Sequence, residues 1–540
     1  MKKTRGADLL VQTLAAAGVT KIFSLSGNQI MPLYDACIDA GIEIIHTRHE
    51  AAAVFMAIAW AQLTGQLGVC MVTAAPGAAN ALGPLFSARR AECPVLFLTG
   101  DSAIAQDGKG AFQELDQVPM TAPLTKLSFR ARSAKRMGHD IARAIRTALS
   151  GRPGPVHVAL PFDVVQADAG GAELPEQSAL RAEPAALRPV DVTRIARILA
   201  AAKQPLIVCG PLMSATRQGG ALAALADAMD APVVAMESPR GLKDPSLGEF
   251  SRVLAKADVV LSLGKPIDYT LGFGSTAVCD EKCKWIVVDA ETGERRRARL
   301  NLGKRLRFAF AADPVTAAAA LCEAGTGGVE RSGWRDEVNK LLAARSLPPA
   351  SGACAGKITP AQLSAAIQRQ LAAASESVLI IDGGEFGQWA QAGTSGTYRL
   401  INGTSGAIGG SLCFGVAARK AKPDAMIVAV MGDGTVGFHF AEFETAVREK
   451  TPFVVVIGND ACWNAEHQIQ LRDYGPERLI GCTLSGARYD LAVEGLGGHG
   501  EYVAAPADLD AALGRAVRSG KVACVNVAIE GWPAPSGAAH

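Results

Sequence analysis

The sequence has no long hydrophobic run and almost no net charge. Its longest apolar run, Ala51–Ala61, is far shorter than the roughly 20 residues that span a bilayer. Asp8 and Gln12 interrupt any signal-peptide core near the N-terminus. The 54 basic and 52 acidic residues leave a net charge of +2, so no field of one sign favours nucleic acid or a membrane surface. We therefore expect a cytoplasmic protein with no nucleic-acid and no membrane partner.

Paired cysteines and aromatic residues are also scarce. The 12 cysteines are scattered, with no CxxC pair and no histidines at zinc spacing. In a chain of 540 residues this pattern excludes a disulfide scaffold and indicates a reducing compartment. Aromatic residues make up only 5%, whereas Gly and Ala are abundant, which suits helices packed closely on parallel sheets.

Short apolar strands alternate with helices along the whole chain, which is typical of parallel sheets covered on both faces. The segments Gln166–Pro189 and Cys322–Ala355 interrupt this pattern. We predict an α/β protein with three doubly wound parallel-sheet domains, at residues 1–165, 190–325 and 355–540. The expected strands are Lys21–Ser24, Ile42–Ile45, Gly68–Thr73, Val95–Thr99, Pro155–Ala159, Pro205–Cys209, Pro232–Ala235, Val259–Leu263, Trp285–Asp289, Val378–Asp382, Met426–Gly432, Phe453–Gly458 and Ala523–Ile529.

The most specific motif lies in the last third of the chain. A strand runs into Gly432-Asp433-Gly434-Thr435, a helix follows, and the next strand ends in Gly458-Asn459-Asp460. Parallel sheets bind ligands at the carboxyl ends of their strands, and backbone amides in such a turn suit a diphosphate. Asp433 and Asp460, 27 residues apart, could bring two oxygens to one Mg²⁺ ion. Taken singly, each segment could also be only a tight turn.

This motif resembles that of thiamine-diphosphate enzymes, in which GDG is followed 25–30 residues later by Asn-Asn. The resemblance covers nearly the whole chain, in the order pyrimidine-binding, central and diphosphate-binding domains. It implies that Asp433, Asp460 and the backbone carbonyl of Cys462 ligate Mg²⁺, and that Gly434 and Thr435 contact the diphosphate. Asp460 stands where the family has Asn, which adds a negative charge to the metal site.

Glu50, in Thr47-Arg48-His49-Glu50, admits two interpretations. Thr-x-x-Glu is a capping box, in which Glu50 would only accept the Thr47 amide. The family, however, has a Glu at the start of this helix, whose carboxylate shifts the tautomer of the cofactor's aminopyrimidine. A carboxylate beside an apolar helix face can share a proton with a ring nitrogen. Together with the metal motif, the resemblance favours Glu50 as the cofactor activator.

Other segments are similar to cofactor-binding parts of the family. Thr73–Asn80 resembles a TxGPGxxN loop, with Ala75 in place of Gly, and implies cofactor contacts from Pro76 and Asn80. Gly384 and Glu385 would cover the other side of the diphosphate. Gly406–Gly409 resembles the segment whose large apolar residue bends the cofactor. That residue would be Ile408.

Three segments are expected near the substrate. Gln113 is predicted to be a catalytic residue, because it matches a substrate-facing Gln of related lyases and carboligases; a polar loop residue is the alternative. Glu466 lies six residues after Asp460, where an acid could protonate the enamine intermediate or shuttle a hydroxyl proton; a solvated helix-face Glu is the other interpretation. The remaining predicted substrate residues are Asn28, Gln29, Phe112, Trp463 and Asn464.

As a whole, the sequence most resembles the benzaldehyde-lyase, 2-hydroxyacyl-CoA-lyase and acetolactate-synthase-like group of the family. It implies a homodimer or homotetramer that cleaves or joins carbon–carbon bonds of 2-hydroxyacyl, including acyl-CoA, or 2-oxo acid substrates. Alternatives are an acetolactate-synthase-type transferase on pyruvate and a 2-oxo acid or oxalyl-CoA decarboxylase. Lys265–Gly274 replaces the family's FAD segment and argues against FAD.

An ADP or CoA site in the central domain stays open from the sequence. Asp289-Ala290-Glu291 ends a strand and could hold a ribose hydroxyl. Arg295, Arg296, Arg297 and Arg299 follow and could meet phosphates, or could form a solvated basic helix face.

Overall fold

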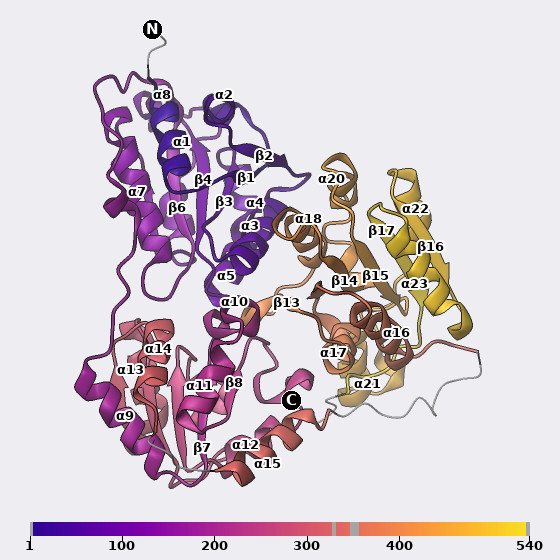
Figure 1. Cartoon of the computed structure of the whole chain (residues 1–540). Helices are drawn as coiled ribbons and strands as arrows, with labels where there is room; N and C mark the ends of the chain where they lie inside the picture. The colour runs from indigo at the N-terminus through magenta and orange to yellow at the C-terminus, as the bar shows by residue number, and fades with distance from the viewer. Residues whose placement is uncertain (1–3, 327–330, 346–355, 536–540) are drawn as a thin grey trace. The chain divides into compact units, whose positions relative to one another are not determined.

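A computed structural model describes residues 4–326, 331–345 and 356–535 of the chain. Its strands form three sheets, all of whose strand pairs are parallel, and helices flank each sheet (Figure 1). This confirms the predicted α/β class with three parallel-sheet domains. The predicted domain boundaries stay predictions.

The chain divides into two compact units. Unit 1 comprises Met1–Glu183, Leu412–Pro423 and His439–Pro452. Unit 2 comprises Pro184–Ser411, Asp424–Phe438 and Phe453–His540. Each unit is described by itself.

The sheet of unit 1 has the order β2-β1-β3-β4-β6-β5. Its strands are β1 (Lys21–Ser24), β2 (Glu43–His46), β3 (Gly68–Val72), β4 (Val95–Asp101), β5 (Leu127–Arg130) and β6 (Val156–Pro161). Helices α1 (Gly6–Ala16) and α7 (Met137–Leu149) pack in a shared core on one face, and α3 (Glu50–Thr64) lies on the other (Figure 1). Unit 1 also contains α20 (Glu442–Arg448).

Helix α3 explains the longest apolar run of the sequence. Nearly all of its residues are buried, which is typical of a helix that is apolar on every side and lies inside a core. No helix in the described residues has the length and hydropathy that crossing a membrane requires.

Unit 2 contains two sheets. The first has the order β11-β10-β9-β7-β8, with β7 (Pro205–Cys209), β8 (Val233–Ala235), β9 (Val259–Leu263), β10 (Lys284–Val288) and β11 (Leu306–Phe310). Separate hydrophobic cores cover its two faces. They include residues of α9 (Pro189–Ala201) and α14 (Pro314–Ala324) in one core, and of α12 (Phe250–Lys256) and α13 (Thr292–Leu302) in the other.

The second sheet of unit 2 has the order β13-β12-β14-β15-β17-β16. Its strands are β12 (Ser377–Ile381), β13 (Tyr398–Ile401), β14 (Met426–Gly432), β15 (Val454–Asn459), β16 (His499–Val503) and β17 (Ala523–Ala528). Helices α16 (Pro360–Ala372), α17 (Gly384–Gly393) and α23 (Leu509–Arg518) share a core with it. Strands β14 and β15 are neighbours, with Gly432 opposite Gly458, so their carboxyl ends lie side by side.

Four strands were not expected from the sequence: β5, β11, β13 and β16. Each lies at the edge of its sheet. Their residues are mostly half-buried, so they lack the continuous apolar run of the central strands.

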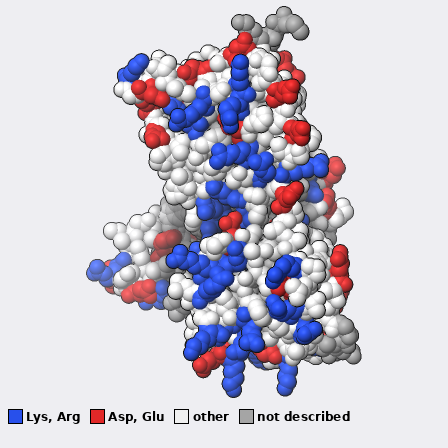
Figure 2. Space-filling model, turned by 90° about the vertical axis from the view of Figure 1, so that its left-hand side faces the viewer, with Lys and Arg blue, Asp and Glu red and all other residues white. Residues whose placement is uncertain are grey.

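Basic and acidic side chains are interspersed on the face shown in Figure 2. Across the described residues, basic and acidic side chains form ion pairs, for example Arg130 with Asp107 at 2.7 Å and Arg335 with Asp227 at 2.6 Å. This mixture agrees with the small net charge of the sequence.

Candidate active site

Glu50 is the first residue of α3, in unit 1, and its side chain is almost fully buried. Its Oε2 accepts a hydrogen bond from Nδ2 of Asn80 at 3.0 Å. Gly77 lies so close that a Cβ there would come within 3.5 Å of Oε1 of Glu50. Two residues of the predicted Thr73–Asn80 loop thus surround this carboxylate.

The predicted alternative for Glu50, a capping box with Thr47, is not what the structure contains. The N–H of Thr47 donates to the Ser24 carbonyl at 2.9 Å. His49 is the N-cap of α3, and its Nδ1 accepts the N–H of Ala51 at 3.1 Å. The Glu50 side chain therefore makes its hydrogen bond away from the end of the helix.

Glu442, which the sequence analysis missed, fixes the start of α3. Its Oε1 accepts the backbone N–H groups of Arg48 at 2.9 Å and His49 at 3.1 Å, and its Oε2 accepts the Thr445 hydroxyl at 2.7 Å. Burial raises the pKa of Glu442. Because Glu442 is 392 residues away from Glu50 in the sequence, no local signal identifies it.

Gln29 and Gln113, two of the predicted substrate residues, are in contact in unit 1. Nε2 of Gln29 donates to Oε1 of Gln113 at 2.9 Å, and Thr73 donates to Oε1 of Gln29 at 2.6 Å. Gln113 has φ +58°, a strained conformation that is common at functional sites. Asn28 and Phe112 are exposed beside them, with Phe112 at 76%.

Ala75, where the resembling loop has Gly, carries backbone strain. Its φ of 45° and ψ of −95° lie outside the regions that L-residues favour. The residue sits immediately before α4 (Pro76–Asn80), so this sharp turn delivers Asn80 to Glu50.

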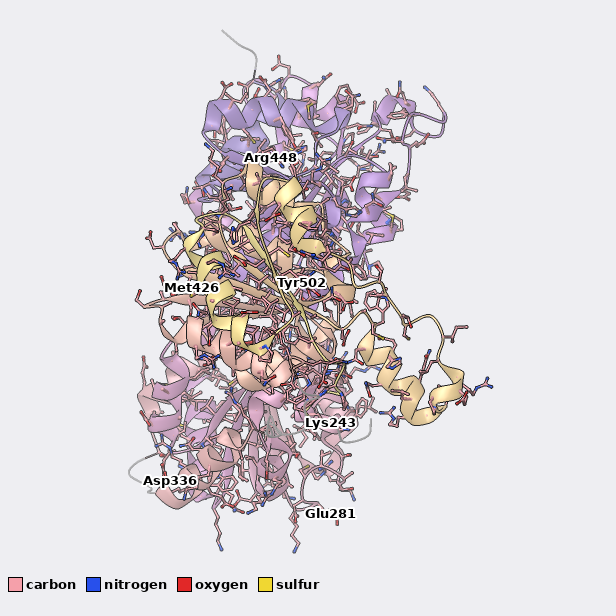
Figure 3. All side chains as sticks on the ribbon, turned by 90° about the vertical axis from the view of Figure 1, so that its right-hand side faces the viewer. Lys243, Glu281, Asp336, Met426, Arg448 and Tyr502 are labelled. Atoms are coloured by element: carbon pink, nitrogen blue, oxygen red, sulfur yellow. The ribbon has the colours of Figure 1, made fainter. Side chains whose placement is uncertain are left out.

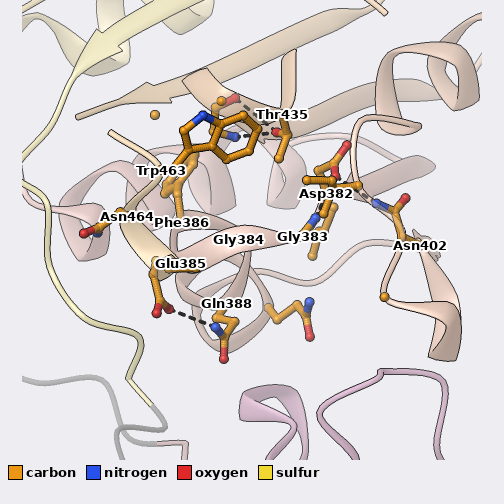
Figure 4. Close-up of a pocket in the computed structure, with 18 of the residues that line it drawn as sticks. Asp382, Gly383, Gly384, Glu385, Phe386, Gln388, Asn402, Thr435, Trp463 and Asn464 are labelled. Carbon is orange, nitrogen blue, oxygen red and sulfur yellow. Dashed lines mark hydrogen bonds between the residues drawn. The ribbon is translucent and has the colours of Figure 1, made fainter. Parts of the chain in front are cut away.

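A pocket of about 380 Å³ lies in unit 2 at the carboxyl ends of β12, β14 and β15 (Figure 4). Its size is within the usual range of small-molecule sites. Figure 4 shows Trp463 beside Thr435, and Glu385 pointing toward Gln388. Every predicted site residue of unit 2 lines this pocket: Gly384, Glu385, Ile408, Asp433, Gly434, Thr435, Asp460, Cys462, Trp463, Asn464 and Glu466.

Asp433 and Asp460 place two carboxylates together at the ends of β14 and β15. Burial raises the pKa of Asp433 to about 6, and burial together with the charge of Asp433 raises that of Asp460 to about 7. Asp433 Oδ2 is buried and has no hydrogen-bond partner in the described residues. Two carboxylates in this state fit a divalent cation that prefers oxygen ligands.

A metal ion bound to Asp433 and Asp460 would need its other ligands from the backbone or from a bound molecule. No cluster of three or more His, Cys, Asp or Glu side chains that could hold a metal occurs in the described part of the chain. The backbone carbonyl of Cys462 and the oxygens of a bound diphosphate are of the required type. The donor set therefore fits Mg²⁺ bound together with a diphosphate.

The loop after β15 is shaped so that its backbone faces the GDG turn. Ala461 has φ +57°, and its N–H donates to Oδ1 of Asn459 at 3.1 Å. A Cβ on Gly434 would meet the Trp463 ring at 2.8 Å, so only glycine fits that position of the turn.

Asp382, at the end of β12, organises the other side of the pocket. Its carboxylate accepts the N–H groups of Gly383 at 2.7 Å, Gly409 at 2.9 Å and Ser411 at 3.1 Å. Burial raises its pKa. These bonds hold the turn before α17 against the loop that carries Ile408, whose side chain would clash with a Cβ on Gly383 at 2.6 Å.

Two glutamates stand at the first turns of α17 and α21 (Asn464–Asp473). Glu385 accepts a hydrogen bond from Gln388 at 2.9 Å, and its pKa is raised mainly by burial. Glu466 is exposed and its charge acts on Glu385. Asn464 donates to the Trp532 carbonyl at 2.9 Å, which ties α21 to the C-terminal segment.

In the central sheet, the residues that could contact a nucleotide instead form hydrogen bonds within their own turn. Asp289 accepts the N–H of Glu291 at 2.8 Å, and Arg295 donates to the carbonyls of Asp289 and Ala290 at 2.6 and 2.9 Å. Lys265 is buried and donates to Thr270 at 2.6 Å. An ADP or CoA site there stays a prediction.

The fold and these sites define a three-domain α/β enzyme that binds a diphosphate cofactor. The chain matches three family descriptions: the N-terminal TPP binding domain of thiamine pyrophosphate enzymes at residues 4–120, the central domain at 192–312 and the C-terminal TPP binding domain at 382–527. The chain belongs to the thiamine pyrophosphate enzyme family.

Similar proteins carry two different activities in their names. The acetolactate synthase large subunit IlvG of Mycobacterium tuberculosis is 32% identical, covering 96% of this chain and 94% of that protein. The 2-hydroxyacyl-CoA lyase 2 of Homo sapiens is 30% identical, covering 92% and 84%. The 2-hydroxyacyl-CoA lyase of Oryza sativa is 28% identical, covering 98% and 96%.

Proposed function

We propose that the chain is a thiamine-diphosphate-dependent carbon–carbon lyase or carboligase. Its donors are 2-hydroxyacyl compounds or 2-oxo acids. The observation that carries this proposal is the buried Glu50 carboxylate, which bonds to Asn80 instead of capping its own helix. A carboxylate placed in this way is suited to share a proton with a cofactor ring.

Mg²⁺ would be held by Asp433, Asp460 and the Cys462 carbonyl, and the diphosphate by Gly434, Thr435 and the turn at Gly384. When bound, the cofactor supplies an electron sink for the carbon next to the substrate carbonyl. The protein supplies binding, conformation and proton transfer. Ile408, held against Gly383, would set the bend of the cofactor.

Glu50, Glu466 and Gln113 would act in proton transfer or in substrate orientation. Glu50 would hold a proton at the N1′ atom of the aminopyrimidine. Glu466 would donate or accept the proton of the substrate hydroxyl, and Gln113, held by Gln29, would orient the substrate oxygen.

The second candidate is an acetolactate-synthase-type transferase acting on pyruvate. The similarity to a protein named acetolactate synthase over 96% of this chain favours it. Product analysis with pyruvate, benzoin, oxalyl-CoA and 2-hydroxyacyl-CoAs separates the two. Acetolactate from pyruvate would assign the transferase, and cleavage of a 2-hydroxyacyl thioester would assign the lyase.

We also propose a cytoplasmic homo-oligomer, at least a dimer. Glu50 belongs to unit 1 and Asp433 to unit 2 of the chain, so a second copy could complete each site. The scattered cysteines, with no CxxC pair in the sequence, support a reducing compartment.

The proposal is tested with Glu50→Gln, which keeps the size of the side chain and its bond to Asn80. We expect calorimetric binding of thiamine diphosphate to persist. The rate of deuterium exchange at the cofactor's C2, followed by NMR, should fall by about 10²- to 10⁴-fold. Unchanged exchange and turnover would refute the role of Glu50.

A further inference from the structure

The pocket of unit 2 is lined by carboxylates and by a single cation. Among the described residues that line it, five are acidic and only Arg240 is basic. The acidic residues are Asp382, Glu385, Asp433, Asp460 and Glu466. The proposed function gives tasks to these acids and none to Arg240.

Within residues 4–326, 331–345 and 356–535, the guanidinium of Arg240 makes no hydrogen bond and no ion pair. In the described part of the chain, Arg240 bonds only through its backbone: its N–H donates to Oγ of Ser238 at 3.2 Å, and its carbonyl accepts the N–H of Lys243 at 3.0 Å. Its charge acts on Glu385, opposing the effect of burial on the pKa of that carboxyl. Glu385 itself accepts from Gln388 at 2.9 Å, and within the described residues it forms no ion pair with Arg240.

The loop that carries Arg240 is fixed in place. Gly241 has φ +55°, and a Cβ there would meet the Thr270 carbonyl oxygen at 2.2 Å, so the loop lies against η8 (Tyr269–Gly274). On the other side of Arg240, Glu237 pairs with the half-buried Arg399 at 3.3 Å. The following turn, η6 (Gly241–Lys243), ends at Lys243, which Figure 3 labels.

The segment η8 also contacts the chain just before Gly406–Gly409, the loop that carries Ile408. The Tyr269 hydroxyl donates to the Thr404 carbonyl at 2.9 Å, two residues before Gly406. Tyr269 and Arg240 both line the pocket. Arg240 is thus presented to the pocket by a rigid support, which lowers the entropy cost of binding a ligand.

We infer that Arg240 binds the negatively charged group of the donor, and that this group is a carboxylate beside the reacting carbonyl carbon. The inference rests on the proposed function and narrows its substrates to acidic donors. A guanidinium matches a carboxylate through two parallel N–H bonds, which lysine cannot reproduce. A phosphate of an acyl thioester would offer the same charge, so the test separates the two.

The test uses the holoenzyme, loaded with thiamine diphosphate and Mg²⁺, and a matched pair of probes. Methyl acetylphosphonate carries one negative charge, and its dimethyl ester is neutral. We expect calorimetry to show that the wild type binds the anion more tightly. Arg240→Gln should weaken binding of the anion by about 10- to 100-fold and leave the neutral ester unchanged, because a charge-assisted bond is lost.

Two further variants show whether the effect belongs to this guanidinium. Arg240→Lys should recover only part of the affinity, because lysine keeps the charge but not the planar pair of donors. Arg252→Gln removes an arginine of α12 whose side chain is 61% exposed, and should change nothing.

Four results would overturn the inference while leaving the proposed function intact. If the wild type did not bind the anion more tightly than the ester, Arg240 would have no role in anion binding. The same would follow if Arg240→Gln bound both probes as tightly as the wild type does. Loss of thiamine diphosphate binding in Arg240→Gln would assign Arg240 to the cofactor. Competition by adenosine 3′,5′-bisphosphate in wild type but not in Arg240→Gln would assign it to a phosphate. Failure of the proposed function would be distinguishable, because the wild-type protein would then not bind thiamine diphosphate when the holoenzyme is prepared.

Discussion

Asp433 and Asp460 make the stability of the metal-free protein depend on pH. Their pKa values are raised to about 6 and about 7, above the value of about 4 for an unfolded Asp. The folded chain therefore holds these protons more tightly than the unfolded chain does. Their contribution to stability is greatest below about pH 4 and is lost as the pH rises through the two raised values.

We predict that the melting temperature of metal-free protein falls by a few degrees between pH 5 and pH 8, and that Mg²⁺ with thiamine diphosphate raises it more at pH 8 than at pH 5. Scanning calorimetry at several pH values measures both effects. Asp460→Asn is the control, because it removes one of the two charges and should flatten the dependence. Equal slopes for the two proteins would show that this pair does not cause it.

Glu50 shows why a residue's role could be predicted only in part. The spacing of Thr47 and Glu50 is compatible with a capping box, and local sequence cannot decide against it. The decision came from the His49 ring, which accepts the Ala51 N–H and makes a second cap unnecessary. Side-chain choices of this kind depend on packing around the helix, which a linear pattern does not contain.

At the scale of elements, the start of α3 depends on a carboxylate from α20. Glu442→Ala would leave the N–H groups of Arg48 and His49 without their acceptor in a buried region. We expect a loss of about 1–3 kcal/mol in the free energy of unfolding. Because Glu50 directly follows His49, we also expect slower deuterium exchange at the C2 of bound thiamine diphosphate.

Thermal unfolding and the exchange rate are measured on the same samples. Glu442→Gln keeps an acceptor oxygen and should recover most of both losses. Glu444→Ala changes a half-buried residue of the same helix that pairs with Arg448 at 3.2 Å but accepts neither of these N–H groups, so it should cause much smaller losses. If folded Glu442→Ala exchanged the C2 proton at the wild-type rate, Glu442 would only stabilise the fold and would not position Glu50.

The strands that sequence analysis found and missed differ in burial. Central strands such as β4 and β12 are buried along their whole length and appear as continuous apolar runs. The edge strands β5 and β16 have no such run, because their residues are mostly half-buried and pairing with a neighbouring strand stabilises them. Likewise Asp382 follows an apolar strand, but its bonds to Gly409 and Ser411 form only when the sheet is assembled.

At the scale of the whole molecule, the sequence predicted three sheets but not the grouping into two units. Residues His439–Pro452 lie in the last third of the chain, yet they belong to the compact unit that contains Glu50. The pattern of strands and helices reports which elements form, since it follows local burial. It does not report which distant helix completes a core, because that depends on contacts between segments far apart in the sequence.

The division of catalytic groups between the two units leads to a prediction about the oligomer. Glu50 lies in unit 1, and Asp433 lies in unit 2. If two chains share their sites, each site takes Glu50 from one chain and Asp433 from the other. Glu50→Gln and Asp433→Asn homodimers would then both be inactive, but a mixed dimer would contain one intact site and one doubly altered site.

Unfolding the two variants together and refolding them should produce mixed dimers. Random pairing places half of the chains in mixed dimers with one intact site each, so activity should recover to about one quarter of the wild-type level. The control is the double variant that carries both changes in one chain, refolded with wild type, whose mixed dimer has two singly altered sites. Its activity should also approach about one quarter, from wild-type homodimers alone. No recovery from the two single variants would mean that each chain builds its site from its own residues.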